Sequence, residues 1–68
     1  MKNKLKVLRA MNDFTQQDLA DKIQVSRQTI NTIEKGKYVP STLLALKMAS
    51  VFNVNVLEIF EMEDSDWS

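Results

Sequence analysis

Apolar residues recur along the chain with a spacing near 3.6 positions, and this spacing predicts a series of short amphipathic helices. Residues that favour helix ends interrupt the pattern at short intervals. Strand-like alternation of apolar and polar residues is nearly absent. The pattern therefore predicts an all-α domain in which five helices follow one another through short connections.

Side chains that cap helix N-termini set the expected boundaries. The predicted helices cover about 2–12, 15–23, 26–35, 41–52 and 56–62, and the first residues of the middle three are Thr15, Ser26 and Ser41. Asn55 caps the last helix, and Gly36 ends the third in the left-handed conformation. We expect one domain over residues 1–62, followed by a short, frayed acidic tail over residues 63–68.

The composition narrows the classes of function. A chain of 68 residues buries a small core and leaves little room for a catalytic pocket. The chain has neither cysteine nor histidine, so it lacks the usual metal ligands, a cysteine nucleophile and the usual general base near neutral pH. We therefore expect no enzymatic activity, no metal and no cofactor. No apolar run approaches the roughly 18 residues of a membrane span and no signal peptide is evident, so a cytoplasmic location is expected.

The net charge of zero hides a strong asymmetry. Nine basic and four acidic residues precede residue 58, which gives that part of the chain a charge of +5. Residues 58–68 hold five acidic residues and no basic one. The larger part is thus suited to a polyanion, whereas the acidic end repels one.

The third predicted helix has a polar face that could read DNA. At about 100° per residue, one arc of about 140° carries a guanidinium, two amides, a hydroxyl and an ammonium, from Arg27, Gln28, Asn31, Thr32 and Lys35. Ile30 and Ile33 lie on the opposite side, where they would face the core. Arginine can bind guanine and an amide can bind adenine through two hydrogen bonds each, so this face has the chemistry of base recognition. The alternative is an ordinary solvated helix face.

The strings FTQQDLADKI (14–23), VSRQTI (25–30) and IEKGK (33–37) resemble the helix-turn-helix of the Cro and phage-repressor (XRE) family of bacterial DNA-binding proteins. The resemblance covers nearly the whole chain and identifies it as similar to a short, stand-alone member. It implies a compact five-helix, lambda-repressor-like domain whose second and third helices form the helix-turn-helix. The third helix would then enter the major groove while the second lies across the backbone.

The resemblance also implies roles for individual residues. The positions that would read bases are Arg27, Gln28, Thr29, Asn31 and Thr32. The positions that would contact the DNA backbone are Gln16, Gln17, Ser26, Lys35, Lys37 and Tyr38. Arg9 and Glu34 match a structural ion pair that joins the first and third helices, and its loss would weaken DNA binding only indirectly.

Three residues depart from the family pattern. Asp13, Gln24 and Asn53 stand where the family commonly has glycine in a backbone conformation with positive φ. Asparagine and aspartate tolerate that conformation, whereas Gln24 gains little local compensation. We therefore expect strain in the turn between the second and third helices.

The implied function is sequence-specific binding of double-stranded DNA by a transcriptional regulator, most simply a repressor. One recognition helix reads few base pairs, so a homodimer on an inverted repeat is expected. Leu57, Phe60 and Trp67 are the candidate interface residues, whereas Leu44 and Met48 are favoured as core. No small-molecule effector or membrane partner is evident. The alternative is an antitoxin-like or accessory module whose main partner is another protein.

Overall fold

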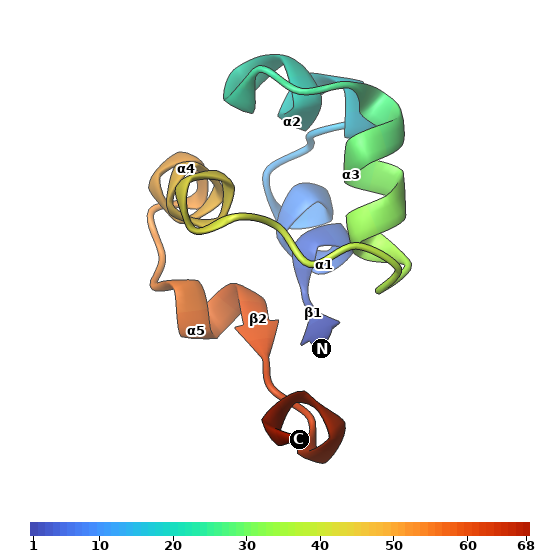
Figure 1. Ribbon diagram of the computed structural model, residues 1–68. Helices are drawn as coiled ribbons and strands as arrows, with labels where there is room; N and C mark the ends of the chain where they lie inside the picture. The colour runs from blue at the N-terminus through green and yellow to red at the C-terminus, as the bar shows by residue number, and fades with distance from the viewer.

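A computed structural model describes all 68 residues and has the predicted five-helix fold (Figure 1). The helices are α1 (Leu5–Met11), α2 (Gln16–Ile23), α3 (Arg27–Glu34), α4 (Thr42–Phe52) and α5 (Val56–Ile59). Two short strands, β1 (Lys2–Asn3) and β2 (Phe60–Glu61), and a C-terminal 3₁₀ helix, η1 (Asp64–Trp67), complete the chain. No helix is long and apolar enough to cross a membrane.

The helices begin at the expected capping residues. The hydroxyl of Thr15 accepts from the N–H of Asp18, whose carboxylate accepts in return from the N–H of Thr15. The hydroxyls of Ser26 and Ser41 accept from the third backbone N–H of α3 and α4. At the start of α5 the carboxylate of Glu58 accepts from the N–H of Asn55 at 2.6 Å. Local sequence therefore determines where each of these four helices starts.

The two ends of the chain differ from the prediction. The first helix begins at Leu5 because Lys2 and Asn3 pair antiparallel with Glu61 and Phe60. The last helix correspondingly ends at Ile59 rather than near Met62. Residues 63–68 are not frayed, since η1 forms there and the ammonium of Met1 lies 3.0 Å from the Glu63 carboxylate. Strands of two residues are too short to show alternation, and their pairing depends on a distant segment.

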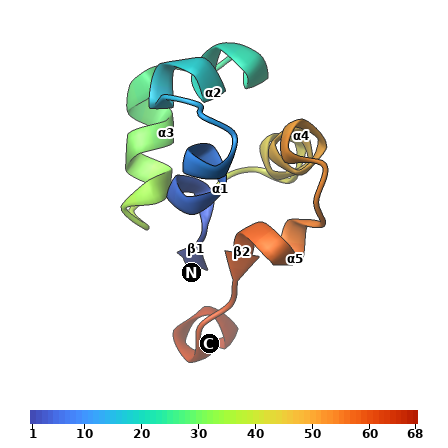
Figure 2. The same ribbon diagram turned by 180° about the vertical axis from the view of Figure 1, so that it is seen from behind.

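A single core joins the helices. Its twelve buried residues are Leu5, Leu19, Ala20, Ile23, Ile30, Ile33, Leu44, Met48, Ala49, Phe52, Ile59 and Phe60. Leu44 and Met48 are buried, as expected for core residues. Figures 1 and 2 show α1 between α3 and α4, with α2 at one end of the molecule and the C-terminal turn at the other. The core thus holds α3 on the side of the molecule away from α4.

The structure confirms the positive φ angles expected at the three positions where the family commonly has glycine. Asp13, Gln24 and Asn53 have φ angles of 56°, 63° and 55°, in the left-handed region expected for them. Gly36 follows α3 with a φ of 74°. Of the three non-glycine residues, Gln24 has the least favourable side chain for this conformation, because it lacks the short polar group of asparagine or aspartate.

Candidate nucleic-acid interface

The turn between α2 and α3 fixes the orientation of the exposed helix. Gln24 ends α2 in the left-handed conformation, Val25 packs against the core, and Ser26 starts α3 one residue later. Ile30 and Ile33, on the inner side of α3, are 0% and 1% exposed. A short turn and two buried isoleucines therefore leave the opposite side of α3 facing solvent.

The candidate base-reading residues lie on this outer side. Arg27 and Gln28 are exposed, whereas Thr29, Asn31 and Thr32 are half-buried. The Thr32 hydroxyl donates to the carbonyl of Gln28 at 2.7 Å, and the Thr29 hydroxyl lies 2.8 Å from that of Ser26. With these hydroxyls engaged, the free hydrogen-bonding groups of the face are the amide of Gln28, most of the Arg27 guanidinium and the amide nitrogen of Asn31.

Gln16 connects the start of α2 to this face. Its amide nitrogen lies 3.3 Å from Asn31 Oδ1 and 3.3 Å from Glu34 Oε1. Its amide oxygen accepts from Arg27 Nη1 at 3.5 Å, the limit of a hydrogen bond. The sequence places Gln16 only as a backbone contact, but the structure adds that it orients two residues of the outer face of α3.

Arg9 and Glu34 form the expected ion pair between α1 and α3. One edge of the guanidinium binds the carboxylate at two points: Nε donates to one oxygen, and Nη2 donates to the other at 3.0 Å. A third donor, Nη1, reaches the carbonyl of Phe14 at 3.0 Å. The hydrogen bond to Glu34 raises the pKa of Arg9, and the pair is mostly shielded, with side-chain exposures of 13% and 8%. The two-point geometry fixes the rotation of α3 against α1.

Asn3 holds the same end of α3 as Arg9, a role that no local sequence pattern indicates. Its amide nitrogen donates to the carbonyl of Ile33 at 2.8 Å, and its amide oxygen accepts from the N–H of Leu5 at 3.2 Å. One side chain thus joins the first residue of α1 to the last turn of α3. The two contacted backbones lie far apart in the chain, so no local motif could have revealed the link.

Cationic and polar side chains surround the outer face of α3. Lys35, Lys37 and Tyr38 are exposed directly after the helix. Gln17, at the other end of the motif, donates its amide to Asp21 at 2.8 Å. Hydrogen bonds from Thr15 hold the pKa of Asp18 below its usual range, so α2 carries negative charge at its start. Two exposed lysines, Lys35 and Lys37, thus lie at the C-terminal end of α3.

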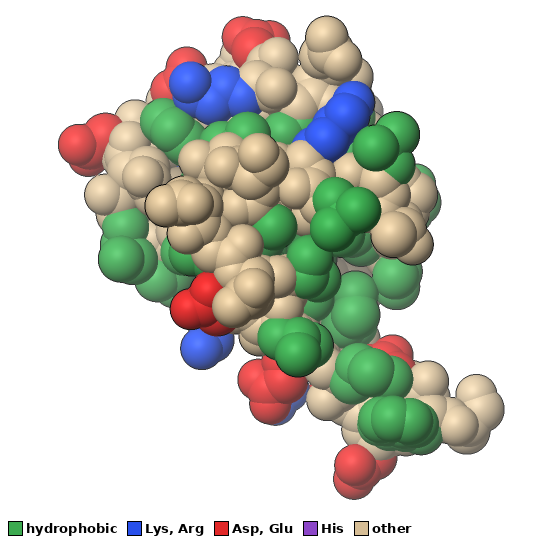
Figure 3. All heavy atoms as spheres, turned by 90° about the vertical axis from the view of Figure 1, so that its left-hand side faces the viewer, with side chains coloured by type: hydrophobic (Ala, Val, Ile, Leu, Met, Phe, Trp, Pro, Cys, Tyr) green, Lys and Arg blue, Asp and Glu red, His purple; other side chains and the backbone are tan.

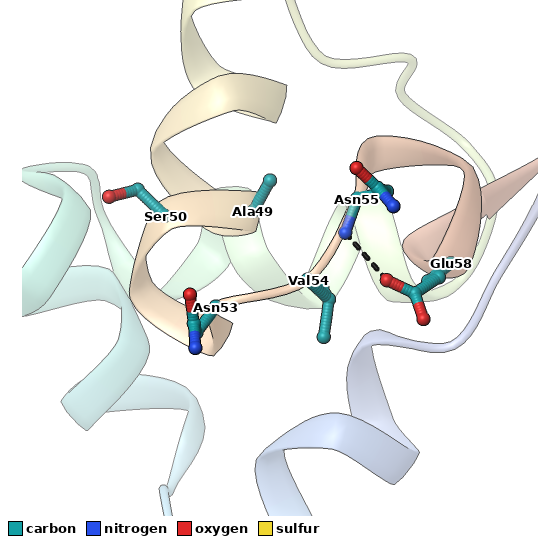
Figure 4. A pocket seen from close by; sticks show the side chains of 6 residues that line it. All are labelled: Ala49, Ser50, Asn53, Val54, Asn55 and Glu58. Carbon is teal, nitrogen blue, oxygen red and sulfur yellow. Dashed lines mark hydrogen bonds between the residues drawn. The ribbon is translucent and has the colours of Figure 1, made fainter.

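A hollow of about 340 Å³ lies between the end of α4 and α5 (Figure 4). Its lining residues are Ala49, Ser50, Asn53, Val54, Asn55 and Glu58. The carboxylate of Glu58 already accepts a hydrogen bond from the N–H of Asn55. Asn53 ends α4 in the left-handed conformation. Because ligand sites are mostly apolar and enclosed, this surface hollow of helix-end residues supplies no argument for an effector site.

The three candidate interface residues separate into two groups. Leu57 and Trp67 are 83% and 77% exposed, so they are free to contact a partner. Phe60 is only 6% exposed and belongs to the core, which corrects its assignment as an interface residue. Pairing of β2 with β1 turns its ring inward. Figure 3 shows hydrophobic side chains along the α4 and α5 side of the molecule and on the protruding C-terminal turn.

Comparisons with known proteins agree with this geometry. The Helix-turn-helix family matches residues 5–59. An uncharacterized HTH-type transcriptional regulator of Methanocaldococcus jannaschii is 58% identical over 66 residues, covering 97% of this chain and 100% of that protein. The corresponding regulator YgzD of Bacillus subtilis is 46% identical with the same coverage.

Among solved structures, the SOS-response transcriptional repressor LexA of Eubacterium rectale superimposes with a TM-score of 0.77 at 33% identity. The match covers 88% of this chain and 64% of that chain. The present chain therefore corresponds to part of the LexA chain, whereas it matches the two regulators over their full length.

Proposed function

The chain belongs to the Helix-turn-helix family of DNA-binding transcriptional regulators, and on that premise we propose that it recognises an operator by inserting α3 into the major groove. The observation that carries the proposal is the outer face of α3. Arg27 and Gln28 are exposed there, and the one carboxylate of the helix, Glu34, is neutralised by Arg9. A face without unpaired negative charge can approach base edges closely.

Phosphate contacts complete the proposed interface. Lys35, Lys37 and Tyr38 follow α3 and bind the backbone beyond its C-terminal end, while Gln16, Gln17 and Ser26 bind it near the helix starts. Asn31, held by Gln16, reads a base beside those read by Arg27 and Gln28. Thr32 offers its methyl group to thymine because its hydroxyl is engaged by the helix backbone.

We further propose that the protein works as a homodimeric repressor in the cytoplasm, bound to an inverted repeat that overlaps a promoter. A single α3 covers only a few base pairs, so two copies with half-sites about 34 Å apart are needed for useful specificity. Occlusion of a promoter requires no additional activity.

Selection of bound sequences from a random duplex library tests the proposal, followed by titration of the selected duplex at two salt concentrations. We expect a short inverted repeat with half-sites one helical turn apart and an affinity that falls steeply with salt. Absence of any enriched sequence would overturn operator recognition. The exposed apolar residues beside the acidic tail would then favour the second candidate function, an accessory module for a protein partner.

A further inference from the structure

The outer face of α4 is an apolar surface with one cation. Leu43 and Leu46 are 65% and 54% exposed, and Lys47 and Ser50 share their side of the helix within an arc of about 100°. Lys47 is half-buried and forms no ion pair. The buried residues of α4 lie on the opposite side. This face, defined by Leu43, Leu46, Lys47 and Ser50, is called the α4 face below.

The C-terminal turn carries the complementary groups. Met62 and Trp67 are 47% and 77% exposed. Glu63 and Asp66 bind the ammonium of Met1, and Asp66 also accepts from the N–H of Glu63 at 2.7 Å, so the turn is held in place. Asp64 is exposed and makes no hydrogen bond or ion pair. The turn thus presents two apolar side chains next to an unpaired carboxylate.

We propose that the α4 face is the docking site for the C-terminal turn of a second copy of this chain. Trp67 and Met62 of one copy pack on Leu43 and Leu46 of the other, and Asp64 lies near the other copy's Lys47. A two-fold axis generates the same contact twice, so both exposed apolar surfaces are covered. The inference rests on the proposed function, which requires two copies on one operator.

Charge favours this pairing over a contact between the two tails. Residues 58–68 carry five acidic residues and no basic one, so two tails facing each other across a symmetry axis would repel. Docking on the α4 face places the carboxylates near a lysine instead. Because α3 and α4 lie on opposite sides of α1 in both ribbon views, the contact leaves the outer face of α3 free for DNA.

Trp67 is the only tryptophan of the chain, so its fluorescence reports directly on this contact. The first measurement is its emission maximum in the full chain without DNA, across a dilution series matched by sedimentation equilibrium. We expect a blue shift that grows with the dimer fraction as the indole leaves water. Dimers with unchanged Trp67 emission, or a chain that stays monomeric at every concentration, would overturn the proposal.

Leu43→Glu tests the docking site, and Val7→Glu is its control. Val7 is 57% exposed on α1 and lies outside the α4 face. We expect Leu43→Glu to raise the dimer Kd about tenfold or more, since it places a carboxylate opposite an acidic turn, and Val7→Glu to leave the Kd near that of the wild type. Thermal melts of both variants establish that they fold. Equal weakening by both would contradict the assignment.

A charge exchange tests the orientation of the contact. Lys47→Glu should weaken the dimer severalfold, and Lys47→Glu combined with Asp64→Lys should restore it. If the double variant dimerised as weakly as Lys47→Glu, the pairing of these two residues would be overturned. Failure of this inference is distinguishable from failure of the proposed function: a dimer assembled through another face would still select an inverted repeat. Loss of sequence selection by the intact dimer would instead refute operator recognition.

Discussion

The side-chain amide of Asn3 donates to the backbone carbonyl of Ile33 at 2.8 Å, which ties strand β1 to the last turn of α3. The same strand pairs with β2 and brings the C-terminal segment beside the N-terminus. In the same C-terminal half of α3, Arg9 pairs with Glu34, and the amide of Gln16 donates to Asn31. α3 is therefore held by polar contacts at several points in addition to its two buried isoleucines, which limits its freedom to move against the core.

Asn3→Ala should weaken binding to the selected operator by about tenfold while the protein remains folded. The substitution removes one of the two donors to the Ile33 carbonyl, which keeps the N–H of Gly36, and removes the side-chain acceptor for the N–H of Leu5. The loss of these two hydrogen bonds costs about 1–3 kcal/mol of stability. The readout is operator affinity, corrected for the folded fraction measured by circular dichroism.

Asn12→Ala is the matched control for Asn3→Ala. Asn12 also donates its amide to a backbone carbonyl at 2.8 Å, but that carbonyl belongs to Leu8 in its own helix. We expect operator affinity close to the wild type after the same correction. If Asn3→Ala had no larger effect on affinity than Asn12→Ala, the amide of Asn3 would serve stability alone.

The Arg9–Glu34 pair makes a prediction about stability. Arg9→Met leaves a largely shielded carboxylate without its main partner, so the free energy of unfolding should fall by about 3 kcal/mol. Arg9→Met with Glu34→Leu removes both charges and should recover much of that loss. Urea denaturation of the two variants makes the comparison. A double variant less stable than Arg9→Met would show that the remaining carboxylate contributes independently, through Gln16.

Gln24→Gly should stabilise the protein by about 1 kcal/mol. The residue has a φ of 63°, where glycine meets no steric penalty from a side chain. Gln17→Gly is a useful control because the same substitution inside α2 should cost about 1 kcal/mol. Thermal unfolding of both variants measures the difference. A lower melting temperature for Gln24→Gly would mean that the Gln24 side chain stabilises the fold by more than its strained backbone destabilises it.

Features encoded in adjacent residues were predictable from the sequence. The capping residues Thr15, Ser26 and Ser41 begin their helices as expected, and the left-handed conformation of Gln24 follows the family pattern. The ion pair between Arg9 and Glu34 followed only from the family resemblance, since 25 residues separate them. Helix capping is local chemistry, whereas long-range pairing depends on the completed fold.

The features that escaped prediction all join distant segments. Pairing of β1 with β2 turned Phe60 from an interface candidate into a core residue. The ammonium of Met1 ordered a tail that had the composition of a frayed end. The amide of Asn3 reached across 30 residues to Ile33. In each case the local sequence does not predict the role of the group. The role follows only from the residue that the group meets in the folded chain.

Acid should destabilise the N-terminus of α2. Hydrogen bonds from the backbone and side chain of Thr15 lower the pKa of Asp18, so its ionised form stabilises the fold above about pH 4, the ordinary value. That contribution is lost as the pH falls through the lowered pKa. Asp18→Asn should therefore show a shallower decline in melting temperature than the wild type between about pH 4 and pH 2.

The control for the acid experiment is Glu61→Gln, because the Glu61 carboxylate makes no hydrogen bond or ion pair and caps no helix. Its melting temperature should follow the wild-type decline. The carboxyl of Asp66, whose pKa is lowered by the N–H of Glu63, adds a similar contribution that both variants retain. An identical decline for Asp18→Asn and the wild type would show that the cap functions equally well without its charge.

Gln28→Ala and Lys37→Ala should separate base recognition from binding of the DNA backbone. The amide of Gln28 is exposed and has no partner in the protein, so its removal should reduce discrimination at one operator position by about 1–3 kcal/mol. Lys37 follows α3 and would meet the backbone, so Lys37→Ala should weaken binding to all duplexes alike and reduce the salt dependence by about one ion.

Competition titrations with single-base variants of the operator, repeated at two salt concentrations, measure both effects for each protein. Stability is not at issue for either substitution, since both side chains are exposed and unpaired. An unchanged base preference in Gln28→Ala would mean that Arg27 and Asn31, and not Gln28, recognise the bases. A change of base preference in Lys37→Ala would mean that the segment after α3 enters the groove instead of resting on the phosphates.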